Sequence, residues 1–194
     1  MFEDVEYKLK KKNKLLFSRD SKCLEDLLLL IRRQKHRTLV LWAFACVKTP
    51  LKIFESKYPD EKRPRNALDL CEKWAKGEVK MPDAKRAILD CHRVCREIDD
   101  AYFIALCHAI GQGVSSVHVE THAIGLAIYE LTAIVLANRD NYQEAVKNKI
   151  KYYMDTLTFF QQHLEEIPYP WADFLLREDV PNKEDLLWAK KMTL

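Results

Sequence analysis

The chain has 194 residues, of which 48% are hydrophobic and 31% charged, and its formal net charge is +3. This composition is typical of one soluble globular domain that buries a core without metal or disulfide support. The small net charge gives no argument for nucleic acid as a partner. With only 4 glycines, the chain is poor in turns, which excludes a many-turned β architecture and favours helices.

The cysteines and the apolar runs indicate the cellular compartment of the protein. Six cysteines lie within apolar periodic segments, at positions 23, 46, 71, 91, 95 and 107. Because the N-terminus carries no signal-peptide pattern, these cysteines predict reduced thiols in the core of a cytoplasmic protein. The longest charge-free apolar run, Leu39 to Val47, is far shorter than the roughly 20 residues that cross a bilayer, so no membrane span is expected.

The first helices are predicted from apolar spacing and from their capping residues. Residues 1–18 are polar and lysine-rich, and they predict a short helix or a frayed basic arm. Ser21 is a suitable N-cap for a first helix over 21–33. A second helix over 36–57 is expected to kink or end at Pro50, because proline lacks a backbone donor and clashes with the preceding turn.

Prolines and glycines set the limits of the next helices. A third helix is predicted over 66–76, with Pro64 at its start and Gly77 in a left-handed cap after its end. A fourth helix follows Pro82 and carries an apolar face over 84–98. Each of these segments is amphipathic, so both are expected to pack on a common core.

The second half of the chain predicts three longer helices. Asp99 or Asp100 can cap a helix over 101–110, which is expected to end at the glycines that follow it. The next helix is expected from Ser115 or Ser116 to Ala137. A further helix is predicted over 142–166, and two shorter segments follow it between prolines.

These elements predict an all-α fold and a single domain over residues 1–194. No segment alternates with the two-residue period of a strand, and no repeat or linker divides the chain. The expected architecture is a multi-helix bundle. The helix near 118–137 is apolar on all sides, so it is predicted to lie at the centre of that bundle.

One polar stripe interrupts this central apolar helix. If the helix already includes His118, then at about 100° per residue His118, His122, Gly125 and Tyr129 share one narrow side. A polar stripe on a buried helix predicts a site, a buried hydrogen-bond network, or both. In the second case, the histidines would bond to backbone carbonyls or to Tyr129.

A metal site is the alternative function for the same histidines. His118 and His122 are four residues apart, a spacing that zinc enzymes use, and His108 and His92 could complete a tetrahedral shell. The H-E-x-x-H signature and paired C-x-x-C clusters are both absent from the sequence. A packed hydrogen-bond network is therefore favoured over a metal, and no cofactor is expected.

Two arginines on either side of a proline form the second candidate element. Arg63 and Arg65 are suited to bidentate pairing with carboxylates. They are predicted to tie the helix start to an acidic side chain of the same chain, or else to hold an acidic loop of another protein. The internal partners that the sequence offers are Asp60, Asp83 and Asp90.

Three further features bear on the class of function. Trp74 lies on the same helix side as Cys71, so it is predicted to be a core residue rather than a binding anchor. A nucleophilic pair of Cys107 and His122 would require the fold to bring the two within hydrogen-bond reach. The sequence contains no Walker-type loop, dinucleotide fingerprint or Gly-x-Ser-x-Gly elbow, so it indicates no enzyme class.

Three short motifs occur in a fixed order. The first is Leu-Trp-Ala at 41–43, the second is Asp-Glu-Lys-Arg-Pro-Arg-Asn-Ala at 60–67 with Trp-Ala-Lys-Gly-Glu at 74–78, and the third runs from Ala-Ile-Gly-Gln at 109–112 to His-Ala at 122–123. This order resembles the immunity proteins of the Imm-five-like kind, helical domains encoded in bacterial polymorphic-toxin loci. The resemblance covers residues 36–137.

The resemblance implies an all-α cytosolic protein that binds and neutralises a cognate toxin without catalysis. The matching positions include Arg63, Arg65, Trp74, His118 and His122. These residues and Tyr129 are the candidate binding residues. Two alternatives remain open, a small metal-binding or hydrolytic enzyme that uses the His118 and His122 stripe, and a structural subunit of a homo-oligomer.

Overall fold

Helices account for all the regular secondary structure in the computed structural model, which describes residues 1–177 and 180–192. The predicted all-α class is therefore confirmed. The α-helices are α1 (Glu3–Lys10), α2 (Glu25–Arg32), α3 (His36–Lys57), α4 (Arg63–Ala75), α5 (Met81–Val94), α6 (Ala101–Ser115), α7 (Ala123–Ala137), α8 (Tyr142–His163) and α9 (Lys183–Met192). The 3-10 turns are η1 (Lys22–Leu24), η2 (Glu120–His122) and η3 (Asp173–Leu175).

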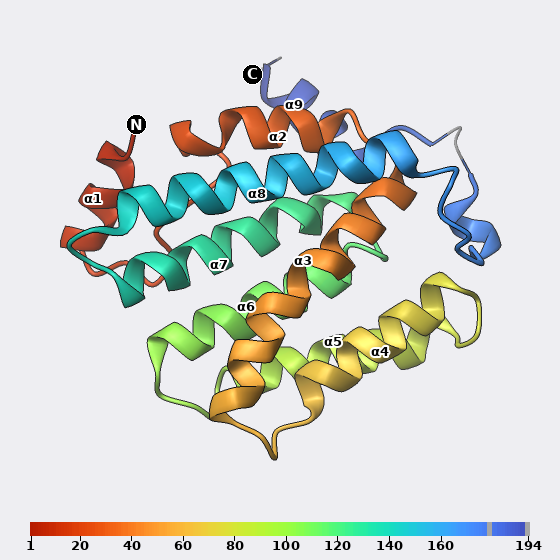
Figure 1. Cartoon of the computed structure of the whole chain (residues 1–194), viewed down its shortest axis with the longest axis horizontal. Helices are drawn as coiled ribbons and strands as arrows, with labels where there is room; N and C mark the ends of the chain where they lie inside the picture. Colours follow the sequence, from red (N-terminus) through yellow and green to blue (C-terminus); the bar gives the residue numbers. More distant parts are fainter. Residues whose placement is uncertain (178–179, 193–194) are drawn as a thin grey trace.

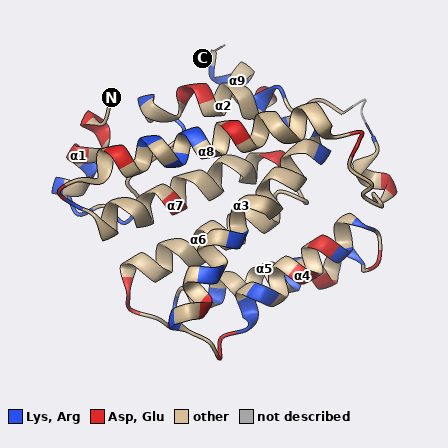
Figure 2. Cartoon of the chain, in the orientation of Figure 1, with Lys and Arg blue, Asp and Glu red and all other residues tan. Residues whose placement is uncertain are grey.

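The helices form two groups that α3 joins (Figure 1). On one side, α8 lies between α2 and α7, and α9 lies on α2. On the other side, α4 packs on α5, and both pack on α6. The long helix α3 crosses from the first group to the second, and it packs on α6 and α8. Acidic and basic residues both occur along α4, α5 and α8 (Figure 2).

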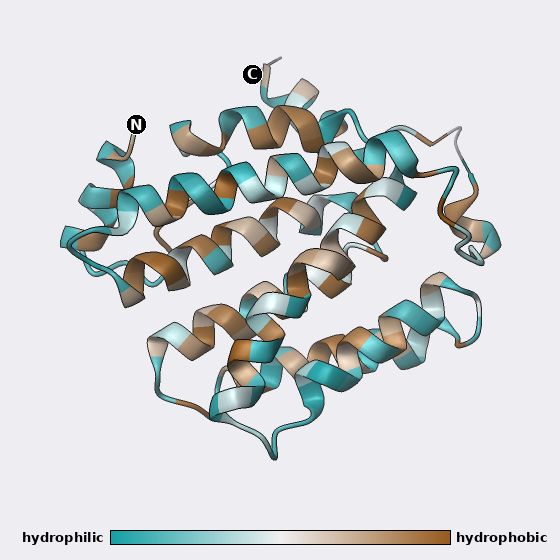
Figure 3. Ribbon diagram, viewed as in Figure 1, coloured by the Kyte–Doolittle hydropathy of each residue, from teal (hydrophilic) through white to brown (hydrophobic). Residues whose placement is uncertain are grey.

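Helix α7 lies at the centre of this arrangement, as the sequence predicts. It packs most extensively on α6, and it also contacts α8, α3 and α2. Hydrophobic residues recur along α6 and α7, whereas much of α8 is hydrophilic (Figure 3). The stretch Glu120–Ala137 is long and apolar enough to cross a membrane, which the sequence analysis did not expect. This is weak evidence for a span, because 67% of the stretch is buried inside the fold, as in the core helix of a soluble protein.

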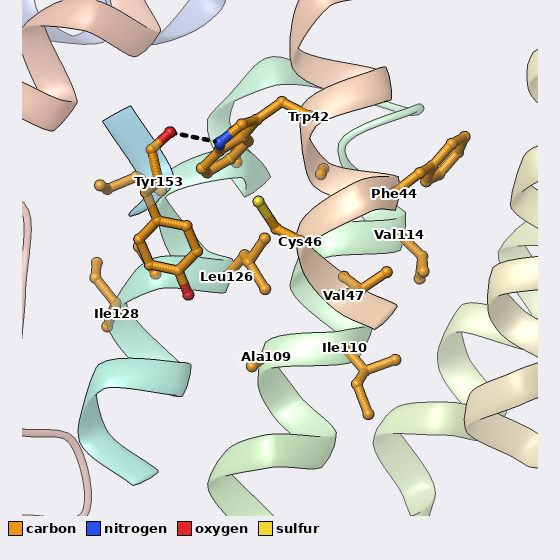
Figure 4. Close-up of a cluster of buried hydrophobic side chains, with 14 of the residues drawn as sticks. Trp42, Phe44, Cys46, Val47, Ala109, Ile110, Val114, Leu126, Ile128 and Tyr153 are labelled. Atoms are coloured by element: carbon orange, nitrogen blue, oxygen red, sulfur yellow. Dashed lines mark hydrogen bonds between the residues drawn. The ribbon is translucent and has the colours of Figure 1, made fainter. Parts of the chain in front are cut away.

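The core between α3, α6, α7 and α8 is built around one buried tryptophan (Figure 4). Trp42 packs edge-on against Tyr153, with ring centroids 5.6 Å apart. Its indole Nε1 donates a hydrogen bond of 3.0 Å to the backbone carbonyl of Tyr153. The bond satisfies the only polar atom of the indole, so the whole side chain can be buried at little cost.

Two glycines within α6 correct the sequence prediction. The helix does not end at residue 110, since it continues through Gly111 and Gly113 to Ser115. A Cβ atom at Gly111 would lie 2.4 Å from the ring of His92, and one at Gly113 would lie 2.2 Å from Val47. These glycines therefore allow α5 and α3 to approach α6 closely, rather than ending the helix.

The start of the chain also differs from the prediction. Residues 3–10 form the short helix α1, with Val5 buried, so the segment is not a frayed arm. Ser21 does not cap α2, because a 3-10 turn precedes that helix. The Ser21 hydroxyl instead donates a hydrogen bond of 2.5 Å to Asp4. Helix α3 passes through Pro50 and ends at Lys57.

Several predicted helix ends are confirmed, and others shift by a turn or less. Asp100 caps α6, where its carboxylate accepts hydrogen bonds from two backbone N–H groups. Gly77 has a φ of 78°, as expected for a left-handed cap after α4. Helix α4 starts at Arg63 rather than residue 66, α5 ends at Val94 rather than residue 98, and α8 ends at His163 rather than residue 166.

The segment after α8 folds back onto the turn between α4 and α5. The backbone N–H of Ala172 donates a hydrogen bond of 2.8 Å to the carbonyl of Ala75. The ring of Phe174 stacks on Trp74 with centroids 5.1 Å apart. The late part of the chain therefore lies beside the end of α4, as Figure 1 shows on the right of the molecule.

Candidate functional site

A strip of polar side chains runs across α5, α6 and the start of α7. We call it the histidine strip, and it consists of His92, His108, Gln112, His122 and Tyr129. The Nδ1 atoms of His92 and His108 lie 3.3 Å apart, so one ring donates a hydrogen bond and the other accepts it. The ring of His108 stacks on Tyr129 with centroids 4.9 Å apart. The strip joins the three helices through side chains that remain partly exposed.

His122 is held at the other end of this strip. Its Nδ1 donates a hydrogen bond of 2.8 Å to Gln112 Oε1. A Cβ atom at position 125 would lie 2.4 Å from that amide oxygen, so Gly125 leaves the space that Gln112 needs. Burial lowers the pKa of His122, and the nearby charges of His118 and Arg19 lower it further. The His122 imidazole is therefore neutral at pH 7.

His118 does not belong to the strip, which corrects the sequence prediction. It lies in the turn between α6 and η2, and its side chain is exposed. Because α7 begins only at Ala123, the expected helical spacing from His118 to Tyr129 does not exist. The ring of His118 instead lies 6.0 Å from that of Trp74, at an interplanar angle of 33°.

A groove of about 210 Å³ opens beside the strip, and we call it the histidine groove. One wall is the exposed side of α5, where Met81, Lys85 and Leu89 follow at four-residue spacing. Met81 and Leu89 are 43% and 49% exposed. The complete lining is Trp74, Met81, Lys85, Ile88, Leu89, His92, Ser115, His118 and His122. Trp74 is buried, as predicted, yet it also lines this groove.

A second pocket of about 290 Å³ shares His118 with the groove, and we call it the basic pocket. Its lining is Gln34, Lys35, His36, Arg37, His118, Glu120, Phe174, Leu175, Arg177, Val180, Asn182 and Lys183. These residues come from the start of α3, from η2 and from the segment after α8. The sequence does not predict this pocket, because no local pattern links residues so far apart in the chain.

A buried carboxylate lies at the inner side of the basic pocket. Glu120 is 4% exposed, and its Oε1 lies 3.7 Å from His36 Nδ1. The other ring nitrogen of His36 donates a hydrogen bond of 2.7 Å to the carbonyl of Ser116. Burial lowers the pKa of His36, and this effect outweighs the attraction of Glu120, which raises it. Glu120 Oε2 and Ser116 Oγ have no hydrogen-bond partner among the described residues.

Arg63 and Arg65 lie away from both pockets and serve as ties within the chain. Arg63 pairs with Glu61 and Glu97, and Arg65 pairs with Glu55 at 2.7 Å. The predicted ion pairing of these arginines within the chain is therefore confirmed, but the partners are glutamates and not Asp60, Asp83 or Asp90. Glu55 comes from the end of α3, Glu97 from the segment after α5, and Glu61 from the turn directly before α4. Trp74 is eleven residues further along α4, roughly 16 Å at 1.5 Å per residue.

The tie at Arg65 gives a testable dependence on pH. The Arg65 guanidinium holds the pKa of Glu55 below its ordinary value. A carboxylate with a lowered pKa in the folded state adds stability above the unfolded pKa of about 4.3, and this is lost as the pH falls through the folded pKa. At pH 7, Arg65→Met is expected to lower the free energy of unfolding by up to about 1 kcal/mol, because the pair is partly exposed.

Urea unfolding at pH 7 and at pH 3 measures this effect. The difference between the wild type and Arg65→Met should shrink at pH 3. The matched control is Arg86→Met, since Arg86 is exposed on α5 and has no ion-pair partner among the described residues. A difference for Arg65→Met that stays the same at both pH values would show that Glu55 does not stabilise the fold through its charge.

The cysteines show no nucleophilic pairing with His122. All six are free, and the Sγ atoms of Cys91 and Cys107 lie 3.9 Å apart in the core. The hydrogen bond to Cys91 and burial raise the pKa of Cys107. Cys95 contacts the histidine strip, but its bond to Cys107 and its burial raise its pKa to about 12. Cys95 and Cys107 therefore stay protonated at neutral pH, and a protonated thiol is a weak nucleophile and a poor metal ligand.

The remaining metal alternative concerns the histidines. Across residues 1–177 and 180–192, no three or more His, Cys, Asp or Glu side chains are grouped in a way that could hold a metal ion. His118 and His122, the proposed pair of ligands, do not share a helix face, since His118 lies outside α7. His92 and His108 meet each other instead, within the histidine strip.

Comparison with known proteins places the chain in a family. The model of the family described as Imm-5 like putative immunity protein matches residues 29–156, which is more than half of the chain. No curated protein and no solved structure matches the chain. The match extends beyond the 36–137 resemblance on both sides and includes α4, α5, α6 and α7, which carry the histidine strip and most of the groove. The chain therefore belongs to the family of Imm-5 like putative immunity proteins.

Proposed function

We propose that this protein is a bacterial immunity protein that binds a cognate toxin in the cytoplasm and neutralises it without catalysis. The observation that carries the proposal is the family match over residues 29–156, which covers every lining residue of the histidine groove. Because an immunity protein acts by occupying its toxin, the function requires a surface that can form a stable interface.

The histidine groove has the composition of such a surface. Interface cores are enriched in tryptophan and methionine and depleted in acidic residues, and the groove combines Trp74 and Met81 with no carboxylate among its lining residues. A pocket next to exposed apolar side chains can accept an anchor residue of a partner. A few such anchor residues supply most of the binding energy of a typical interface. Leu89 lies on the exposed edge of the groove, where a bound partner would cover it.

Growth protection tests the proposal. Each toxin domain found in a gene next to this one is expressed together with the wild type, which is expected to restore growth in the presence of its cognate toxin and to copurify with it. Leu89→Asp is expected to weaken binding at least about tenfold, because it buries an unpaired charge at the interface. The Tm should change little, since the position is exposed in the free protein.

The matched control is Leu186→Asp on α9. Leu186 is 45% exposed, close to the value of Leu89, but it lies outside both the groove and the family match. This variant should protect as well as the wild type. Failure of the wild type to bind or protect against any neighbouring toxin would overturn the proposed function. Equal protection by both variants would place the interface elsewhere on the protein.

A further inference from the structure

The histidine groove and the basic pocket form one continuous surface. His118 lines both, and Trp74 connects them, because its ring lies beside that of His118 and stacks on Phe174 of the basic pocket. The two hollows are therefore adjacent, because they share His118. We call the two hollows together the joined surface.

The charges of the joined surface are strongly uneven. Among its described lining residues, the only carboxylate is that of Glu120, which is buried beside His36. The histidines at positions 36, 92, 118 and 122 also line the joined surface. The cationic lining residues are Lys35, Arg37, Lys85, Arg177 and Lys183.

Part of this positive charge has no ion-pair partner among residues 1–177 and 180–192. Lys35 and Arg37 pair with Glu165, at 3.4 and 3.1 Å. No carboxylate of the described residues lies within ion-pair distance of Lys85 or Lys183, and both side chains are exposed. These two lysines stand on opposite hollows of the joined surface, one on α5 and one at the start of α9.

The first turn of α3 adds to the same field. Residues 34–37 line the basic pocket, and the N-cap residue of α3, Lys35, makes no side-chain cap hydrogen bond. The N-terminus of a helix carries partial positive charge on its unbonded N–H groups, and α3 has 22 residues. Lysine side chains and a helix N-terminus both favour negatively charged ligand groups.

We propose that the joined surface binds an acidic segment of the toxin, with an apolar side chain in the histidine groove and carboxylates at Lys85 and Lys183. This inference rests on the proposed function and specifies its partner. The apolar side chain contacts Trp74 and Leu89, and the flanking carboxylates meet the positive field of the basic pocket. Such complementarity speeds association and selects the partner more than it adds affinity at equilibrium.

Charge reversal tests this inference. The probe is the purified toxin domain encoded beside the gene, and its association rate and Kd are measured at low and at physiological salt. Lys85→Glu combined with Lys183→Glu is expected to weaken binding at least about tenfold, mainly through slower association, and to reduce the salt dependence of the rate. Circular dichroism and the Tm verify that the double variant is folded.

The matched control is Lys10→Glu combined with Lys147→Glu. It changes the net charge equally, at two exposed lysines on α1 and α8 that line neither hollow. The control is expected to bind within about threefold of the wild type, because distant exposed charges are screened by salt. Lysine substitutions of the toxin's acidic residues should restore its binding to the Lys85→Glu and Lys183→Glu variant.

The outcomes separate the two proposals. If the wild type binds the toxin and the two double variants weaken binding equally, the acidic-segment inference is wrong and the proposed function stands. If the charge-reversed variant alone loses fast association, the inference is supported. If the wild type binds no neighbouring toxin, the proposed function fails and the inference fails with it.

Discussion

Replacing Lys149 by methionine is expected to lower the free energy of unfolding by about 3–5 kcal/mol. Lys149 Nζ lies 2.6 Å from Glu130 Oε1, and Glu130 is 4% exposed within the central helix α7. The hydroxyl of Tyr153 donates a hydrogen bond to the same carboxylate. Loss of the lysine leaves a buried carboxylate without its countercharge, which costs far more than an exposed ion pair. Urea unfolding at pH 7 measures the change.

Two companion variants identify the cause. Combining Lys149→Met with Glu130→Gln removes both charges and keeps a partner for the Tyr153 hydroxyl, so it should recover most of the lost stability. Lys151→Met, which breaks an exposed pair with Asp155, should cost no more than about 0.5 kcal/mol. An equal loss for Lys149→Met and Lys151→Met would show that the buried pair has no special role.

The loss of stability in Lys149→Met should also depend on pH. Burial raises the pKa of Glu130, and removal of Lys149 removes an attraction that lowers it. In the variant, the folded protein therefore keeps a proton that the unfolded chain releases above its pKa of about 4.3. The loss of stability is expected to be larger at pH 7 than at pH 5.

Truncation of the central helix should have the second largest effect. Leu131→Ala, or Ile124→Ala, is expected to cost roughly 2–5 kcal/mol, because each side chain is fully buried in α7 and its loss leaves a cavity. The matched control is Leu89→Ala, which shortens an exposed leucine on α5 and should change stability by less than about 0.5 kcal/mol. A negligible loss at both buried positions would contradict the central position of α7.

The fold could be predicted where a residue's local role is unambiguous. Asp100 supplies the hydrogen-bond acceptor that a helix start requires, and Gly77 adopts a backbone conformation that other residues avoid. The caps at the start of α6 and after the end of α4 were therefore predicted correctly. Gly111 and Gly113 were misinterpreted because glycine has two common uses, as a helix end and as a point of close approach. Only the position of His92 and Val47 in space distinguishes these uses.

The candidate site, too, could be predicted only where local spacing determines how residues are placed. His122 and Tyr129 were placed on one side of a helix by spacing alone, and in the structure each contacts a polar residue of α6, His122 through Gln112 and Tyr129 through His108. His118 was misplaced, because the prediction started the helix five residues or more before its observed start at Ala123. The basic pocket could not be predicted, since it depends on packing the start of α3 against the segment that includes Lys183.

The basic pocket lies partly outside the region that the family shares. Arg177 and Lys183 lie beyond residue 156, whereas Trp74 and Leu89 lie within the matched region. A relative with a different tail would retain the apolar groove and the cationic residues Lys35, Arg37 and Lys85, but would lose the contribution of Arg177 and Lys183. If the joined surface binds a toxin as proposed, divergence of the tail would change the charge that the toxin meets, while the helical scaffold stays unchanged.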